Sequence, residues 1–207
     1  MSDASILDRT RRYYEGRLRE HGTVPRGVDW NSAESQALRF DQLARLLDGT
    51  PDASVLDYGC GYGALAPYLR ERGHTGAYVG FDVSPAMVEA ARLTVAGLPA
   101  CSVTADRASL APADVVVASG IFNVRMDVPE ADWRVFVHDT LDDLASLART
   151  GFAFNVLSLH SDPDRRRPDL YYADPCELFE ACCERFSPRV ALLHDYPLYE
   201  FTVLVRL

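Results

Sequence analysis

Residues 55–64 read VLDYGCGYGA, an apolar run that leads into three glycines at alternate positions. A short apolar run followed by glycines predicts a buried strand that enters a tight turn. Residues 64–72 then predict a helix that begins at once. Because glycine has no Cβ, such a turn lets backbone N–H groups approach a ligand at the start of a helix. The stretch therefore predicts a site for a nucleotide-type cofactor.

Two kinds of cofactor fit this turn, and Asp57 separates them. Gly59, Gly61 and Ala64 match the dinucleotide fingerprint, in which the turn faces a pyrophosphate. The carboxylate of Asp57, two residues before the first glycine, would repel a pyrophosphate and attract a ligand that carries an ammonium and a sulfonium. S-adenosylmethionine is such a ligand. The residues favour it over a nicotinamide dinucleotide, and a turn whose glycines serve backbone geometry alone stays open.

The composition is that of a globular chain with an acidic balance. The 207 residues are 48% hydrophobic and 25% charged, with a net charge of −9, which fits one domain and disfavours a general nucleic-acid-binding surface. The apolar runs are short of a membrane span, and the N-terminus lacks the order of a signal peptide. The five cysteines follow neither a disulfide framework nor a zinc spacing. We expect a cytoplasmic protein without metal, membrane or nucleic-acid partner.

Strand and helix patterns alternate from residue 51 to the end of the chain. This alternation predicts a doubly wound α/β fold with a mostly parallel sheet. About six residues separate the last two strands, too few for a crossover, so the last strand should be antiparallel. We expect seven strands at 54–58, 78–82, 101–105, 114–118, 151–159, 190–194 and 201–205, and helices at 64–72, 85–95, 129–149 and 175–186.

The first 50 residues predict two helices ahead of the sheet, at 4–20 and 33–47. They are too short to form a domain. We therefore expect a single domain, 1–207, with an N-terminal helical lid at 1–50 over a Rossmann-like core at 51–207. The side chains that could close over the site are Tyr13, Tyr14, Trp30 and Arg39. Simple packing of these helices on the core is the competing interpretation.

Acidic and small residues follow the predicted strands, where ligands of open α/β sheets lie. Asp82 comes 19 positions after Gly63, roughly the separation at which an acidic residue binds ribose hydroxyls, although it could also cap the next helix. Asp106 and Arg107 follow the third strand, where a side chain can reach an adenine edge or simply lie in a solvated turn. Ser119 opens a small-then-apolar run suited to a flat ligand.

Residues 55–64, 78–92 and 114–124 together resemble the class I, seven-strand methyltransferases that use S-adenosylmethionine. The resemblance covers roughly residues 36 to 207. It implies that the glycine turn contacts the methionine part of the cofactor, and it does not fix the acceptor residues. The implied contacts are Gly59, Gly61 and Gly63 at the methionine, Asp82 at the ribose, Val83 and Met87 near the adenine, Asp106 near its amino group and Ser119 near the sulfonium. The residues after the fourth strand do not read Asn-Pro-Pro-Tyr or Asp-Pro-Pro-Tyr, which disfavours planar amino groups of nucleic-acid bases and glutamine as acceptors.

Methyl transfer is an in-line displacement in which the protein aligns the reactants, excludes water and sometimes supplies a base. His160 follows the fifth strand and His194 the sixth, so both are candidate catalytic bases at the ligand edge of the sheet. A lone histidine is more often structural or exposed than catalytic, and this interpretation stays open for both.

The acceptor is expected to meet the segment 161–174 and the residues just after the fourth strand. Tyr171 and Tyr172 are candidates for a pocket wall, with packing of their loop on the sheet as the open alternative, while Asn123 and Arg125 are candidate polar anchors. The compact chain leaves few residues for a macromolecule-binding domain, so we expect O- or N-methylation of a small molecule. The alternatives are a nicotinamide-dependent oxidoreductase and a non-catalytic protein that keeps the fold.

Overall fold

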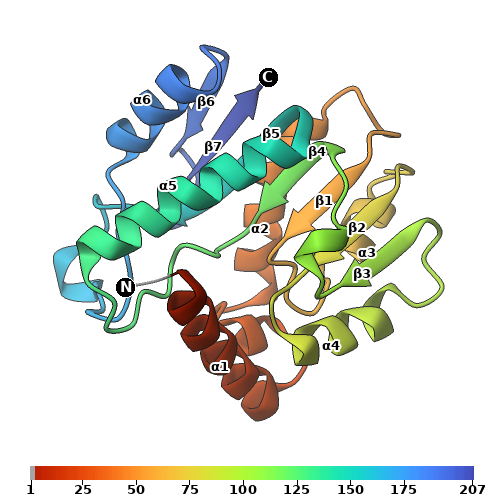
Figure 1. Ribbon diagram of the computed structural model, residues 1–207, viewed down its shortest axis with the longest axis horizontal. Helices are drawn as coiled ribbons and strands as arrows, with labels where there is room; N and C mark the ends of the chain where they lie inside the picture. The colour runs from red at the N-terminus through yellow and green to blue at the C-terminus, as the bar shows by residue number, and fades with distance from the viewer. Residues whose placement is uncertain (1–2) are drawn as a thin grey trace.

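The computed structural model, which describes residues 3–207, folds around one seven-stranded sheet in the order β3-β2-β1-β4-β5-β7-β6 (Figure 1). β7 runs antiparallel to both β5 and β6, and the pairs among β1 to β5 are parallel. The predicted α/β fold and its antiparallel last strand are confirmed. The strands are β1 Val55–Tyr58, β2 Tyr78–Phe81, β3 Cys101–Thr104, β4 Ala113–Ala118, β5 Ala148–Leu157, β6 Val190–Leu193 and β7 Glu200–Arg206.

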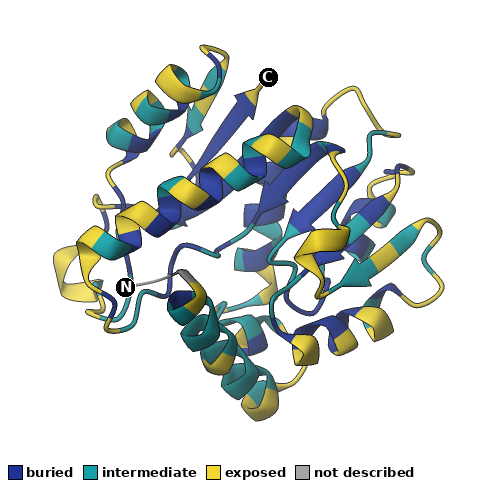
Figure 2. Ribbon diagram, in the orientation of Figure 1, coloured by how far each residue is buried: buried dark blue, intermediate teal, exposed yellow. Residues whose placement is uncertain are grey.

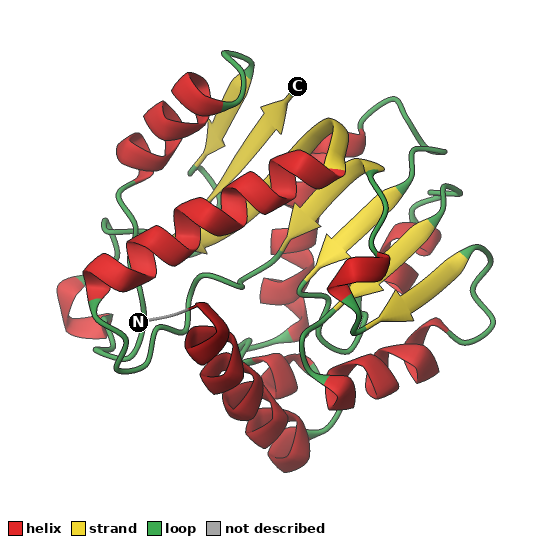
Figure 3. Cartoon of the chain, in the orientation of Figure 1, coloured by secondary structure: helices red, strands yellow, loops and turns green. Residues whose placement is uncertain are grey.

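Helices cover both faces of this sheet (Figure 3). α2 and α3 pack on one face, with α4 beside α3, while α5 lies against β4 and β5 on the other face and α6 against β6 and β7. The helices are α1 Asp3–His21, α2 Ala33–Ala44, α3 Leu65–Glu71, α4 Pro85–Val95, α5 Glu130–Leu147 and α6 Pro175–Arg185. The predicted helix at 33–47 is present, and its last turn, Arg45–Leu47, is a 3-10 helix.

The hydrophobic core is divided by the sheet into two layers. Alternate residues of a strand point to opposite faces, so Val115 and Val117 of β4 pack with Leu43 of α2, while Val116 packs with Trp133 of α5. The central strands β1, β2, β4 and β7 are accordingly buried along most of their length, the edge strands β3 and β6 are more exposed, and the outward sides of α5 and α6 are exposed (Figure 2). A strand that is covered on both faces reads as a continuous apolar run, which is why periodicity located these strands well.

The connection from β3 to β4 contains only a short 3-10 helix, Arg107–Ser109. It brings Arg107 next to α5, where the guanidinium forms an ion pair with Asp143 and its Nε donates to the Tyr58 hydroxyl at 3.4 Å. This contact joins the ends of β1 and β3 to α5. It closes one side of the ligand edge of the sheet.

α1 lies at the carboxyl ends of the strands, beside α4 and below the start of α5 in Figure 1. Arg9 forms an ion pair with Asp127, and Arg17 pairs with Asp29 at 3.1 Å, so α1 is joined to the segment before α5 and to the segment before α2. Across residues 3–207, every helix is too short or too polar to cross a membrane.

Candidate active site

A cavity of about 180 Å³ lies at the carboxyl ends of β1, β2 and β4. α1, the residues before α2, and α5 supply the rest of its walls. Eight of the ten residues predicted to bind the cofactor line it: Asp57, Gly59, Gly61, Asp82, Val83, Met87, Arg107 and Ser119. The sequence alone therefore indicates most of one wall of the cavity, although the contacts of these residues with a cofactor stay predictions.

Asp57 is a buried carboxylate at the end of β1, with a side chain 3% exposed. The hydroxyl of Tyr78 donates to its Oδ2 at 2.6 Å. Burial raises the pKa of Asp57 to about 7, and the hydrogen bond from Tyr78 only partly offsets this effect. The hydrogen-bond donor is a neutral hydroxyl, so a cationic ligand in the cavity would stabilise the ionised form of Asp57.

Asp82 joins the glycine turn after β1 to the turn after β2. Its Oδ2 accepts from the Gly61 N–H and its Oδ1 from the Ser84 N–H, both at 2.9 Å. Burial raises the pKa of Asp82 to about 6 despite these two backbone donors. Gly61 has φ +54°, a conformation that favours glycine, so the turn that presents its N–H to Asp82 depends on this residue type.

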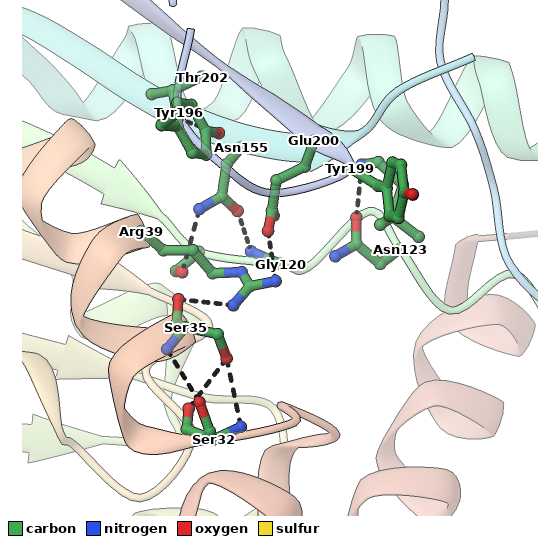
Figure 4. Close-up of polar contacts among 12 residues, drawn as sticks. Ser32, Ser35, Arg39, Gly120, Asn123, Asn155, Tyr196, Tyr199, Glu200 and Thr202 are labelled. Atoms are coloured by element: carbon green, nitrogen blue, oxygen red, sulfur yellow. Dashed lines mark hydrogen bonds and ion pairs between the residues drawn. The ribbon is translucent and has the colours of Figure 1, made fainter. Parts of the chain in front are cut away.

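The end of β4 is held from β5. Asn155 is fully buried; its Oδ1 accepts from the Gly120 N–H at 2.7 Å and its Nδ2 donates to the Ser119 hydroxyl at 3.4 Å. Figure 4 shows Asn155 reaching toward Gly120. The loop after β4 is thus fixed next to the loop after β1, and the two form neighbouring parts of the cavity wall.

Residues 28–30, which we call the strap, lie against both of these loops. A Cβ at Gly61 would lie 2.8 Å from Cγ1 of Val28, and a Cβ at Gly120 would overlap the ring of Trp30. Val28 and Trp30 also line the cavity. The strap therefore closes the cavity from the N-terminal side, with glycines in both loops leaving room for it.

Two residues predicted to bind the cofactor, Gly63 and Asp106, are outside the cavity lining. Gly63 faces Ala91, whose Cβ would be 3.1 Å from an added Cβ, so this glycine permits α3 and α4 to approach. Asp106 is exposed, and its Oδ1 accepts from the Ala108 N–H at 2.9 Å. Asp106 therefore caps the 3-10 helix Arg107–Ser109. Its contact with adenine stays a prediction.

The predicted bases, His160 and His194, lie together on the surface. Both are exposed, their ring centroids are 5.9 Å apart, and neither lines the cavity. Partial burial and the neighbouring His160 lower the pKa of His194. The strand-end rule placed them at the correct edge of the sheet, yet their loops do not reach the cavity. Their catalytic role stays a prediction.

The predicted acceptor residues join the segment 161–174 to the residues after β4. The Asn123 Oδ1 accepts from the Leu157 N–H at 3.1 Å, and Arg125 donates to the carbonyls of Val128 and Pro168. Tyr171 is buried in the core, and the Tyr172 hydroxyl accepts from the Arg167 N–H at 2.9 Å. All four predicted acceptor residues, Asn123, Arg125, Tyr171 and Tyr172, lie outside the cavity lining.

The N-terminal helices and α5 contribute lining residues that the sequence reasoning missed. Gln36 and Phe40 of α2 line the cavity, and Gln36 accepts a hydrogen bond at 2.9 Å from the hydroxyl of Tyr62 in the glycine turn. A polar Gln36 four residues before Phe40 on the buried face of a helix was the available signal. The other missed lining residues include Leu7, Thr10, Arg11, Val28, Phe136, Asp139, Thr140 and Asp143.

A model of the methyltransferase domain family matches residues 31–205. The chain belongs to this family. A Mycobacterium tuberculosis protein, Rv1506c, named as a candidate methyltransferase, is 49% identical over 166 residues, which are 78% of this chain and 98% of that protein. Together with the sheet order, these matches identify an S-adenosylmethionine-dependent methyltransferase and decide against the nicotinamide-dependent alternative.

Solved structures with the same fold include methyltransferases bound to the cofactor product. The magnesium protoporphyrin IX methyltransferase of Synechocystis PCC 6803 with bound S-adenosylhomocysteine has a TM-score of 0.68 and 18% identity, covering 99% of each chain. The N-methyltransferase NodS of Bradyrhizobium japonicum WM9, also with S-adenosylhomocysteine, has a TM-score of 0.65 and 17% identity, covering 95% of this chain and 97% of that one. At this identity the likeness of this methyltransferase to both structures concerns the fold.

The residues around the cavity fit S-adenosylmethionine. The cofactor brings two cationic groups, and the cavity presents two carboxyl groups with raised pKa values, the buried Asp57 and the half-buried Asp82. Apolar walls from Phe81, Val83 and Ile121 suit its adenine. Among residues 3–207, no group of three or more His, Cys, Asp and Glu side chains has the arrangement of a metal site.

Proposed function

We propose that this methyltransferase modifies a small-molecule acceptor at an oxygen or nitrogen atom. The observation that carries the proposal is the enclosure of the cavity by α1 and the strap, which belong to the same chain as the sheet. An acceptor that reaches the end of β4 has to fit beneath these elements. A small molecule can do so, whereas a macromolecule would have to displace them.

In this proposal the chain aligns the reactants and keeps water away. When bound, S-adenosylmethionine supplies an activated methyl group on a cationic sulfur. Asp82 accepts hydrogen bonds from the ribose hydroxyls, and Asp57 attracts the cationic methionine part. Asn155 fixes the loop after β4, and Ser119 of this loop would lie near the sulfur. The strap and α1 exclude water, so the acceptor is the nucleophile that meets the methyl group.

The structural neighbours support a small acceptor by analogy. The Synechocystis protein is named for methylation of magnesium protoporphyrin IX, and NodS is named an N-methyltransferase. Both structures cover almost the whole of this chain. The acidic balance of the chain, with a net charge of −9, also disfavours a polyanionic acceptor.

The test measures formation of S-adenosylhomocysteine with two sets of acceptors. One set contains small amines, phenols and carboxylic acids, and the other contains RNA, DNA and protein extracts. We expect turnover with at least one member of the first set and none with the second. Turnover confined to the macromolecular set would overturn the proposal. Binding of S-adenosylhomocysteine, measured by titration calorimetry, confirms that the preparation is competent.

His160 and His194 remain our candidates for a base if the acceptor is a hydroxyl group. A base should be needed for turnover but not for cofactor binding. The double variant His160→Asn/His194→Asn is therefore expected to lose turnover of a hydroxyl acceptor while it binds S-adenosylhomocysteine as the wild type does. Unchanged turnover would remove both residues from the mechanism.

A further inference from the structure

A buried ion pair joins the N-terminal part of the chain to the last strand. Arg39 of α2 contacts Glu200 at the start of β7, with side chains 7% and 0% exposed (Figure 4). Burial raises the pKa of Glu200, and the neighbouring guanidinium opposes this effect. A buried ion pair is costly to desolvate and often adds little net stability, so its presence calls for another reason.

The guanidinium of Arg39 is held in one orientation by three contacts. Glu200 pairs with Nη2, the Ser35 carbonyl accepts from Nη1 at 2.7 Å, and the Trp30 ring lies beneath it, with its centroid 3.8 Å from Cζ. Ser32 and Ser35 form a capping box at the start of α2, which fixes the backbone just after Trp30. The capping box thus fixes the backbone next to Trp30, and Arg39 fixes its ring.

Trp30 in turn lies at the end of β4. Its ring occupies the space that a side chain at Gly120 would need, and Gly120 has φ +72°. Asn155 fixes the Gly120 N–H from the other side at 2.7 Å. The indole is therefore packed against a rigid part of the cavity wall, next to Ser119.

We propose that Arg39 and Glu200 are positioning residues that hold Trp30 over the cofactor cavity. This proposal rests on the proposed function, in which the end of β4 lies beside the sulfur of the cofactor. The attraction between a cation and an indole ring is stronger when the cation is desolvated. The buried carboxylate of Glu200 keeps the Arg39 guanidinium over the Trp30 ring. Neither Arg39 nor Glu200 lines the cavity, so both act through Trp30.

The competing explanation is a structural tie between α2 and β7 with no effect on the cavity. Two variants separate the explanations. Arg39→Lys keeps a positive charge for Glu200 but removes the planar group that stacks on Trp30. Glu200→Gln keeps the shape of the side chain and removes its charge.

Arg72 provides the matched control. Its guanidinium also stacks on an aromatic ring, with Cζ 3.6 Å from the Tyr68 centroid, and also pairs with a carboxylate, Asp41 at 3.3 Å. Neither Arg72 nor Tyr68 lines the cavity. Arg72→Lys therefore makes the same chemical change away from the site.

The experiment measures two quantities in the full chain: the dissociation constant of S-adenosylhomocysteine and the quenching of tryptophan fluorescence by acrylamide. The chain has two tryptophans, and Trp133 is fully buried, so quenching reports Trp30. We expect Arg39→Lys and Glu200→Gln to increase quenching and to weaken binding about tenfold, as for loss of a desolvated cation–π contact. Arg72→Lys should change neither quantity.

If Arg39→Lys folds and both quantities equal those of the wild type, the pair is a structural tie and the proposal is overturned. Should both variants fail to fold, Trp30→Phe and Trp30→Ala test the same point, because unchanged binding in Trp30→Ala would also overturn it. Wild-type protein that binds no S-adenosylhomocysteine would instead contradict the proposed function.

Discussion

Asp57 and Asp82 give cofactor binding a pH dependence at the scale of single residues. Their pKa values of about 7 and about 6 mean that both carboxyl groups are protonated in acid, and a cationic ligand favours the ionised forms. We expect the affinity for S-adenosylhomocysteine, which carries an ammonium, to fall as the pH is lowered through this range. Calorimetry at several pH values measures this, and Asp57→Asn should flatten the part of the profile near neutral pH. A flat wild-type profile would contradict the assignment.

The carboxyl group of Asp57 also makes the stability of the ligand-free protein depend on pH. This dependence runs opposite to that of ligand affinity. A carboxyl group whose pKa is higher in the folded than in the unfolded chain makes the folded state less stable as the pH rises between the two values. For Asp57 that window runs from the ordinary value of 3.8 to about 7. We expect Asp57→Asn to raise the melting temperature of the ligand-free protein above this window and to change it little below.

Replacement of Asp82 tests the predicted ribose contact. Asp82→Ala should weaken binding of S-adenosylhomocysteine by about 1–3 kcal/mol, the scale of hydrogen bonds to a charged group. Asp106→Ala is the control, because that carboxylate is exposed and lies outside the cavity lining. Equal losses of affinity in the two variants would support the predicted contact of Asp106 with adenine. No loss in Asp82→Ala would remove the ribose assignment.

Gly61 is needed for three reasons, of which the sequence indicated one. The expected reason was close approach to the cofactor, and the structure adds the positive φ and the contact of Val28 with the space beside Gly61. We expect Gly61→Val to remain folded, because the turn lines the cavity and belongs to neither core layer, and to lose detectable binding of S-adenosylhomocysteine. Circular dichroism checks the fold, and a folded variant that binds normally would contradict all three reasons.

At the scale of elements, the sequence located the strands and helices because their signals are local. Apolar runs mark strands that are covered on both faces, and caps such as Ser84 with Pro85 mark helix starts. The direction of a loop is not a local property. The loops that carry His160 and His194 leave the correct sheet edge but turn to the surface, whereas α1 and the strap, which have weak apolar patterns, lie over the cavity.

The attachment of α1 depends on Asp29, at the strap. Asp29 accepts from the Tyr13 hydroxyl at 2.9 Å, pairs with Arg17 at 3.1 Å and lies 3.8 Å from Arg167. We expect Asp29→Asn to release S-adenosylhomocysteine faster in stopped-flow measurements, because the asparagine tolerates the φ of +63° but loses both ion pairs. Asp8→Asn is the control, since among residues 3–207 the ion pairs of Asp8 lie within α1, with Arg11 and Arg12. Equal dissociation rates in wild type and Asp29→Asn would mean that α1 does not restrain the ligand.

At the scale of the whole molecule, one sheet supports both core layers, and the buried pair of Arg39 and Glu200 joins the N-terminal part to β7, the last strand of the chain. We therefore expect a single cooperative unfolding transition for residues 1–207, as for one domain. S-adenosylhomocysteine at a hundredfold excess over its dissociation constant should raise the free energy of unfolding by about 2.7 kcal/mol without splitting the transition, while NAD should have no effect. Calorimetry follows the transition, and hydrogen exchange follows α1 and the strap. Two transitions, with only the later one shifted by ligand, would show that the N-terminal helices unfold separately from the sheet and do not share in holding the cofactor.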